Sequence, residues 1–151
     1  MNIQNNIKQR MIKACISMQK RTMEEAEKLS EEIQSQINDY GQNKDRYDSF
    51  RTKMSRMKEM YIKQIENAAS NIKTLLGIHV EKKEDTVKFG SIIITDKQRF
   101  FIAVGIGKIR FEEEEYFVIS TVAPIFNAIK GKRAGNTFTF NNITHIIQEI
   151  F

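Results

Sequence analysis

The stretch that decides the fold is residues 50–76, which read FRTKMSRMKEMYIKQIENAASNIKTLL. Apolar side chains recur in it at steps of three or four residues, and no glycine or proline interrupts them. This spacing puts them on one face of an α-helix and is typical of the a and d positions of a coiled coil. The stretch therefore predicts a long helix with one apolar seam, made of Phe50, Met54, Met57, Tyr61, Ile65, Ala68, Ile72 and Leu75.

The residues before this stretch predict a second helix that pairs with the first. No glycine or proline lies between Asn2 and Tyr40, and apolar residues recur there at less regular helical spacing. We therefore expect residues 1–76 to form an antiparallel coiled-coil hairpin, about 50 Å long for some 35 residues per helix. The expected seam of the earlier helix is Ile12, Ile16, Met23, Ala26, Leu29, Ile33 and Ile37. Because methionine packs adaptably, we also assign Met11, Met18 and Met60 to the core of the hairpin.

The hairpin turn, near residues 39–49, carries the chemistry most relevant to function. Gly41 breaks the helix, and Asp39, Asp45 and Asp48 surround it. One interpretation is structural, because Asp45 or Asp48 can accept the free N–H groups at the start of the next helix. The other is functional, because carboxylates at the end of a stalk can coordinate a hard divalent cation presented by a partner. The sequence leaves both interpretations open.

Beyond a linker at residues 77–86, the pattern changes to short runs rich in Ile, Val and Phe. Pro124 and Gly131 predict the start and the end of one short helix, over 124–130. The charged run 112–115 predicts a solvated loop or a strand edge. Together these patterns predict an α+β chain in which residues 87–151 form an antiparallel sheet around one helix. The predicted strands cover 89–95, 99–106, 116–120, 137–141 and 144–150.

Composition places the chain among ordinary water-soluble proteins. Its 151 residues are 40% hydrophobic and 28% charged, with a formal net charge of +5. No run approaches the roughly 20 apolar residues of a membrane span, and the polar start lacks the apolar core of a secretory signal, so we expect a cytoplasmic monomer. Cys15 has no partner for an internal disulfide, and His79 and His145 do not make a zinc site. So mild a basic excess does not by itself indicate a nucleic-acid binder.

Several stretches resemble the bacterial Gre transcript-cleavage factors. Residues 119–132, ISTVAPIFNAIKGK, are similar to the proline-led helix that ends in Gly-Lys in that family, and AGN at 134–136 is similar to the Gly-Asp turn after it. The closing strand at 146–150, the FGS at 89–91 and the glycine-led turn at 40–45 match further positions in the same order. The resemblance covers the whole chain and is most specific in the sheet domain.

The resemblance implies a function. A Gre factor rests its FKBP-like sheet domain on RNA polymerase near the secondary channel and inserts the coiled coil into that channel. Its tip carboxylates help to hold a magnesium ion there, so that the polymerase cleaves its own backtracked RNA. By this resemblance the chain is a transcription elongation regulator and not an enzyme. It has no cofactor of its own, and it meets DNA and RNA only within the transcription complex.

At the tip, the resemblance assigns Asp45 to the second acidic position of the family, where it would contact the magnesium ion. Asp39 or Asp48 is the candidate for its partner. The first acidic position holds Gln42 instead. A neutral amide does not compensate the charge of a cation, so we expect little stimulation of cleavage. Docking on the polymerase does not depend on this change.

In the sheet domain, the matched positions are Pro124, Gly131 and Lys132. Their structural interpretation is a helix start, a helix end and an exposed charge, and their functional interpretation is contact with the polymerase. Ala123 replaces the serine that precedes the proline in the family, and Phe126 is a further variation.

Two other functions deserve comparison. A coiled-coil adaptor, unrelated to transcript cleavage, would pack its hairpin against another helical protein, and an exposed apolar stripe on the hairpin would favour it.

Prolyl isomerase activity would need a pocket that binds proline. We do not expect this activity, because the sheet domain has no tryptophan and few aromatic residues suited to line such a pocket, and fold alone does not imply function.

Overall fold

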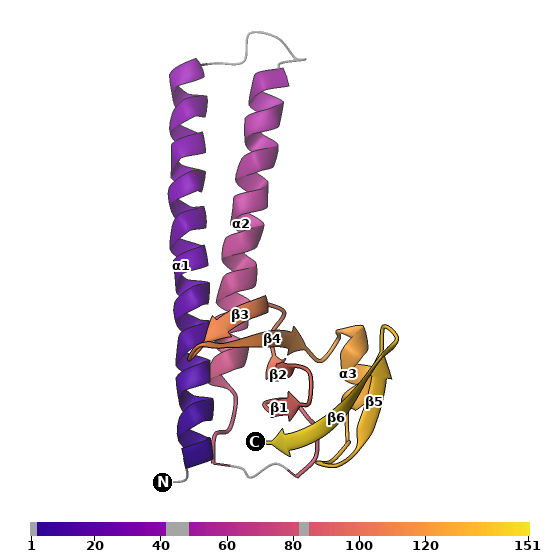
Figure 1. Ribbon diagram of the computed structural model, residues 1–151. Helices are drawn as coiled ribbons and strands as arrows, with labels where there is room; N and C mark the ends of the chain where they lie inside the picture. The colour runs from indigo at the N-terminus through magenta and orange to yellow at the C-terminus, as the bar shows by residue number, and fades with distance from the viewer. Residues whose placement is uncertain (1–2, 42–48, 82–84) are drawn as a thin grey trace. The chain divides into compact units, whose positions relative to one another are not determined.

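A computed structural model describes residues 3–41, 49–81 and 85–151 of the chain. Two long helices, α1 (Ile3–Tyr40) and α2 (Ser49–Leu76), precede a domain of strands with one short helix (Figure 1). The predicted α+β class is therefore confirmed. In these described ranges, no helix combines the length and the apolar character that a membrane span requires.

Within residues 16–73, α1 and α2 run antiparallel beside each other as a helical hairpin (Figure 1). The predicted seam of α2 is confirmed, since each of its residues is buried or partly buried while most residues between them are exposed. Polar contacts connect the two helices outside the seam. Lys58 Nζ donates to Gln34 Oε1 at 2.5 Å, and Asn71 Nδ2 donates to Gln19 Oε1 at 2.9 Å.

Two predicted seam residues lie outside the seam. Leu29 is 39% exposed and Met60 is 47% exposed. Met60 precedes the seam residue Tyr61, and one residue turns a helix by about 100°, which carries Met60 away from α1. In α1, Leu29 lies three residues after the buried Ala26, and Ser30 lies four residues after it. Ser30 is partly buried while Leu29 is exposed, so Ser30 takes the inward position that the sequence assigned to Leu29.

The remaining elements form one six-stranded sheet with the order β3-β4-β2-β1-β6-β5. Neighbouring strands pair antiparallel except β2 and β4, which are parallel, so the sheet is mixed and not purely antiparallel as predicted. The helix α3 (Pro124–Ile129) lies between β4 and β5 in the chain. The strands are β1 (Ile92–Thr95), β2 (Arg99–Ala103), β3 (Gly107–Phe111), β4 (Glu114–Ser120), β5 (Thr137–Phe140) and β6 (Ile143–Ile150).

The sequence did not predict β3, which forms a hairpin with β4. The two-residue turn between them is Glu112 and Glu113, with φ of 48° and 69°. Both residues thus adopt the left-handed conformation of a type I′ turn, which Asn and Gly favour and glutamate does not. The first predicted strand also begins later than expected, at Ile92, because Gly90 has a φ of 91° and donates its N–H across to Ile102.

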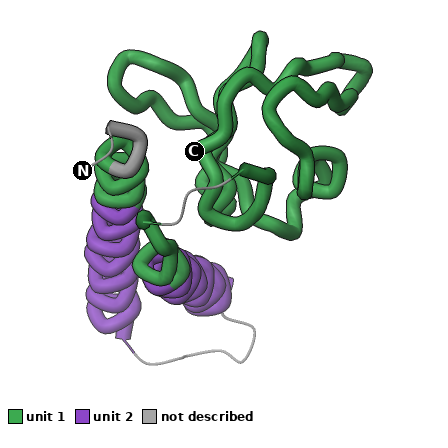
Figure 2. The backbone as a smooth tube through the Cα atoms, turned by 90° about the horizontal axis from the view of Figure 1, so that it is seen from below, with its two compact units in different colours: residues 1–15, 74–151 green, residues 16–73 purple. Residues whose placement is uncertain are grey.

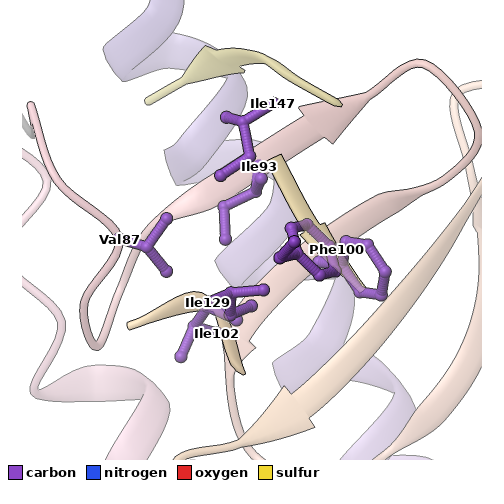
Figure 3. Close-up of a cluster of buried hydrophobic side chains, with 7 residues drawn as sticks. Val87, Ile93, Phe100, Ile102, Ile129 and Ile147 are labelled. Atoms are coloured by element: carbon purple, nitrogen blue, oxygen red, sulfur yellow. The ribbon is translucent and has the colours of Figure 1, made fainter. Parts of the chain in front are cut away.

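The core of the sheet domain is a cluster of buried apolar side chains, to which the strands and α3 contribute (Figure 3). Ile129 is its only fully buried contribution from α3. Burying each such side chain stabilises the fold by about 1.5–3 kcal/mol, so this cluster contributes to the stability of the domain. Its members are Val87, Ile93, Phe100, Ile102, Ile129, Phe138 and Ile147.

The chain divides into two compact units (Figure 2), residues 16–73 and residues 1–15 with 74–151. The first turns of α1 thus group with the sheet domain, although α1 itself is one continuous helix. In this second unit Arg10 forms a two-pronged ion pair with Glu112, with Nε–Oε1 at 2.5 Å and Nη2–Oε2 at 3.2 Å. The hydrogen bond from Arg10 lowers the pKa of Glu112.

Candidate functional site

The described ends of the hairpin show how its tip begins. Helix α1 ends at Tyr40, where Gly41, with a φ of 88°, donates its N–H to the carbonyl of Ile37 at 3.3 Å. A glycine in this conformation ends many helices, because it carries no Cβ to clash. The rings of Tyr40 and Phe50 then approach to 4.5 Å between centroids and connect the two helices beside the turn.

The predicted tip carboxylates are only partly described. Asp39 lies exposed in the last turn of α1. Asp45 and Asp48, together with Gln42, lie outside the described residues, so their grouping with Asp39 stays a prediction. Among the described residues, no three His, Cys, Asp or Glu side chains stand close enough together to hold a metal ion.

Asp39 still has a definite electrostatic setting. The last carbonyl groups of a helix lack partners within it, and they give its C-terminal end a partial negative charge. An exposed carboxylate in that turn adds a full negative charge to the same place. The last turn of α1 therefore carries a local negative charge.

In the sheet domain, the structure places the matched positions around α3. Pro124 is exposed and begins α3, and Ala123, at the N-cap, makes no side-chain hydrogen bond there. Gly131 follows the helix with a φ of 77°, which favours glycine over any other residue. Its N–H donates to the carbonyl of Val87 at 2.8 Å, and Val87 in turn donates to the carbonyl of Lys132 at 2.9 Å.

These contacts give Pro124, Gly131 and Lys132 clear structural roles. Pro124 starts α3. Gly131 and Lys132 form two backbone hydrogen bonds with Val87, which join the end of α3 to this residue of the core. Pro124 and Gly131 are also exposed, and Lys132 is partly exposed, so the same segment remains available to a partner. Whether it makes such a contact stays a prediction.

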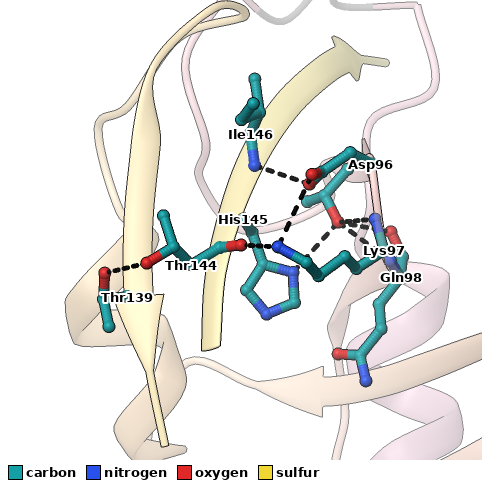
Figure 4. Close-up of polar contacts among 8 residues, drawn as sticks. Asp96, Lys97, Gln98, Thr139, Thr144, His145 and Ile146 are labelled. Carbon is teal, nitrogen blue, oxygen red and sulfur yellow. Dashed lines mark hydrogen bonds and ion pairs between the residues drawn. The ribbon is translucent and has the colours of Figure 1, made fainter. Parts of the chain in front are cut away.

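Sequence reasoning missed a second group of polar residues, around the turn between β1 and β2 (Figure 4). Asp96 Oδ1 accepts the backbone N–H of Ile146 at 2.8 Å, and this bond lowers the pKa of Asp96. Lys97 Nζ donates to the carbonyl of Thr144. The run TDKQ between two apolar stretches is a turn signal, but nothing local shows that it meets β6, some 50 residues later.

Comparisons with known proteins give one distant likeness. No protein-family model matches the sequence, and no curated protein matches it either. The structure is similar to the crystal structure of GreA factor homolog 1 (Gfh1) protein of Thermus thermophilus, with 12% sequence identity and a TM-score of 0.36, over 93% of this chain and 94% of that chain. Because identity and TM-score are both low, the function of this chain has to be argued from its own residues.

Proposed function

We propose that this chain is a transcription elongation regulator of the Gre type. It binds RNA polymerase through its sheet domain and inserts the α1–α2 hairpin into the secondary channel. The observation that carries the proposal is the order of its parts. A two-helix hairpin with a glycine-led polar turn precedes a sheet domain in which the Gre-like motif, from 119 to 132, coincides with a proline-started helix and its glycine end.

The hairpin has the dimensions and surface of an arm that reaches into a narrow space. Its shorter helix, α2, has 28 residues, and at about 1.5 Å per residue it spans about 42 Å. Two helices side by side measure about 20 Å across. Apart from the seam, most of α2 is exposed and polar, as expected for a segment that enters a water-filled channel.

The surface of the hairpin argues against the adaptor function. In the described part of residues 16–73, the exposed large apolar residues are few and scattered: Leu29, Tyr40, Met60 and Ile62. Met60 and Ile62 are two residues apart, so they project about 200° apart around α2. They do not form the continuous apolar stripe that a helical partner would need.

Within the proposal, regulation by channel occupancy is favoured over strong stimulation of cleavage. The family uses two acidic residues at the tip, and Gln42 occupies the first of these positions. An amide coordinates a cation through its oxygen but brings no negative charge, so it raises the occupancy of a second magnesium ion less than a carboxylate does. Asp45, with Asp39 or Asp48, remains the candidate for residual stimulation.

A backtracked-complex assay tests the proposal. Stalled RNA polymerase from the same organism is incubated with magnesium and with the wild-type chain or one of three variants, Asp39→Ala, Asp45→Ala and Asp48→Ala. Asp85→Ala, at an exposed position outside the hairpin, is the matched control. Binding and RNA length are measured in the same samples.

We expect the wild-type chain to bind the polymerase with little shortening of the RNA. Shortening that a single tip alanine abolishes, and that Asp85→Ala leaves intact, would show that the tip assists the metal despite Gln42. A chain that does not bind the polymerase at all would contradict the proposal and restore the adaptor function.

A further inference from the structure

The side-chain amine of Lys8 is independent of the hairpin tip and of the proposed function. Only 2% of the surface of Lys8 is exposed. Met11 and Ile12, three and four residues further along α1, are buried as well, so Lys8 lies on the inward face of the helix. Lysine is rarely found there, because burying its charge costs free energy unless a partner compensates it.

No described residue compensates this charge. Within residues 3–41, 49–81 and 85–151, Nζ of Lys8 makes no hydrogen bond and no ion pair. The nitrogen is nevertheless not sealed from solvent, since it is absent from the fully enclosed side-chain nitrogens that lack a partner. The carbon chain is thus buried while its end reaches a small opening, as in other lysines that extend towards the surface. A small molecule can therefore reach the amine, and a large one cannot.

A second positive charge acts on the same amine. Burial lowers the pKa of Lys8 from 10.5 to about 8, and the positive charge of Lys88 contributes to this shift. Lys88 precedes β1 and belongs to the same compact unit, residues 1–15 and 74–151. Because like charges repel, these surroundings disfavour the positively charged form of Lys8.

A neutral amine is a nucleophile, and an ammonium group is not. At about pH 8, about half of the Lys8 side chains are neutral in the folded protein, against less than about 1% for a lysine with the ordinary pKa. A reaction that converts this amine into an anion also replaces repulsion by Lys88 with attraction. The reagent has to be small and uncharged to enter a position that is 2% exposed.

We propose that Lys8 is a carbon dioxide site, at which Nζ forms a carbamate whose negative charge pairs with Lys88. The lone pair of the neutral amine forms a bond to the carbon of CO₂, and one C=O π bond breaks to leave the negative charge on oxygen. The nitrogen then releases one proton to water. The balance is Lys–NH₂ + CO₂ → Lys–NH–COO⁻ + H⁺, so the step needs no oxidant, reductant or further reagent.

NMR of the full chain detects the carbamate directly. The lysines carry ¹⁵N at Nζ only, and the sample is equilibrated at about pH 8 with ¹³C-labelled bicarbonate and dissolved CO₂. The carbon of a lysine carbamate is bonded to ¹⁵N, so its signal is split. Bicarbonate gives an unsplit signal, and so does a carbamate on an α-amino group, whose ordinary pKa is also close to 8.

We expect one split signal in the wild type. Lys8→Arg keeps a long cationic side chain but has no reactive amine, so the signal should disappear. Lys13→Arg, at an exposed position of the same helix, is the matched control and should retain it. Lys88→Gln removes the neighbouring charge, so the carbamate fraction should fall by at least about twofold.

The absence of a split signal in the wild type would overturn the proposal, and that measurement needs no variant to fold. A signal that persists in Lys8→Arg would also overturn it, because the carbamate would then be on another lysine. An unchanged carbamate fraction in Lys88→Gln would refute the ion pair with Lys88.

Discussion

At the scale of single residues, Lys8 shows how burial changes a charge. It is 2% exposed, and burial together with the nearby positive charge of Lys88 lowers its pKa from 10.5 to about 8. The folded state therefore releases the proton of Lys8 at a lower pH than the unfolded state does. Below about pH 8 the amine is charged in both states, and burying this charge lowers the free energy of unfolding by its full amount. As the pH rises from 8 towards 10.5, the amine becomes neutral in the folded state and this destabilisation disappears.

Replacing Lys8 should therefore stabilise the protein in a pH-dependent way. Lys8→Met keeps most of the buried carbon chain and removes the amine, so it should raise the midpoint of thermal unfolding by a few degrees at about pH 7. The gain should shrink by about pH 10, where Lys8 is already largely neutral. Circular dichroism melts at both pH values measure it. Lys13→Met, at an exposed position, should have almost no effect at either. A gain that is the same at both pH values would contradict this explanation.

Cys15 should be unreactive in the folded protein. It has 0% of its surface exposed, and burial raises the pKa of its thiol from 9.0 to about 11. Because the thiolate is the reactive form, this shift alone lowers the reactive fraction about 100-fold at about pH 8. Ellman's reagent should therefore modify the native chain at least 100-fold more slowly than the chain unfolded in guanidinium. Comparable rates in the two states would show that Cys15 is accessible.

At the scale of elements, a substitution in the turn between β3 and β4 should make the protein more stable. Glu113 adopts a φ of 69°, which costs a residue with a Cβ about 1 kcal/mol or more. Glu113→Gly should therefore raise the free energy of unfolding by about 0.5–1 kcal/mol, and it leaves the ion pair of Glu112 with Arg10 in place. Chemical denaturation measures the change. Gly105 is the control: its φ is not positive and the space around it is open, so Gly105→Ala should not lower the stability through strain. A loss of stability in Glu113→Gly would contradict the strain argument.

The elements also show which features the sequence could predict. The seam of α2 was predictable residue by residue, because helical periodicity is a local property. Strand β3 was missed although exposed Lys108 and Arg110 alternate with buried Ile109 and Phe111, which is the pattern of a half-buried strand, because this short run leads directly into the charged residues 112–115. The parallel pairing of β2 with β4 was also hidden, because register between strands depends on contacts that no short stretch encodes.

At the scale of the whole molecule, prediction was most limited where distant segments meet. The position of Gly131 as a helix end could be read from its neighbours, but its ladder with Val87 joins residues more than 40 positions apart. A hollow of about 280 Å³ is lined by side chains from β2, β4, α3, β5 and β6, among them Phe100, Phe117 and His145, and no short stretch of sequence shows that these meet. The tip carboxylates Asp45 and Asp48 were named from a local motif and remain predictions.

The central claim is that the tip of the hairpin enters RNA polymerase, and site-specific crosslinking tests it most directly. Ser49→Cys places a thiol on the first, exposed residue of α2, and Ala69→Cys places a matched one about 30 Å along the same helix. Each thiol carries a short photo-crosslinker, while the buried Cys15 stays unlabelled. We predict that Ser49→Cys crosslinks to polymerase residues near the catalytic magnesium ion and that Ala69→Cys crosslinks only nearer the channel entrance. Crosslinks from both positions to the outer surface alone, or none to the polymerase, would contradict the account.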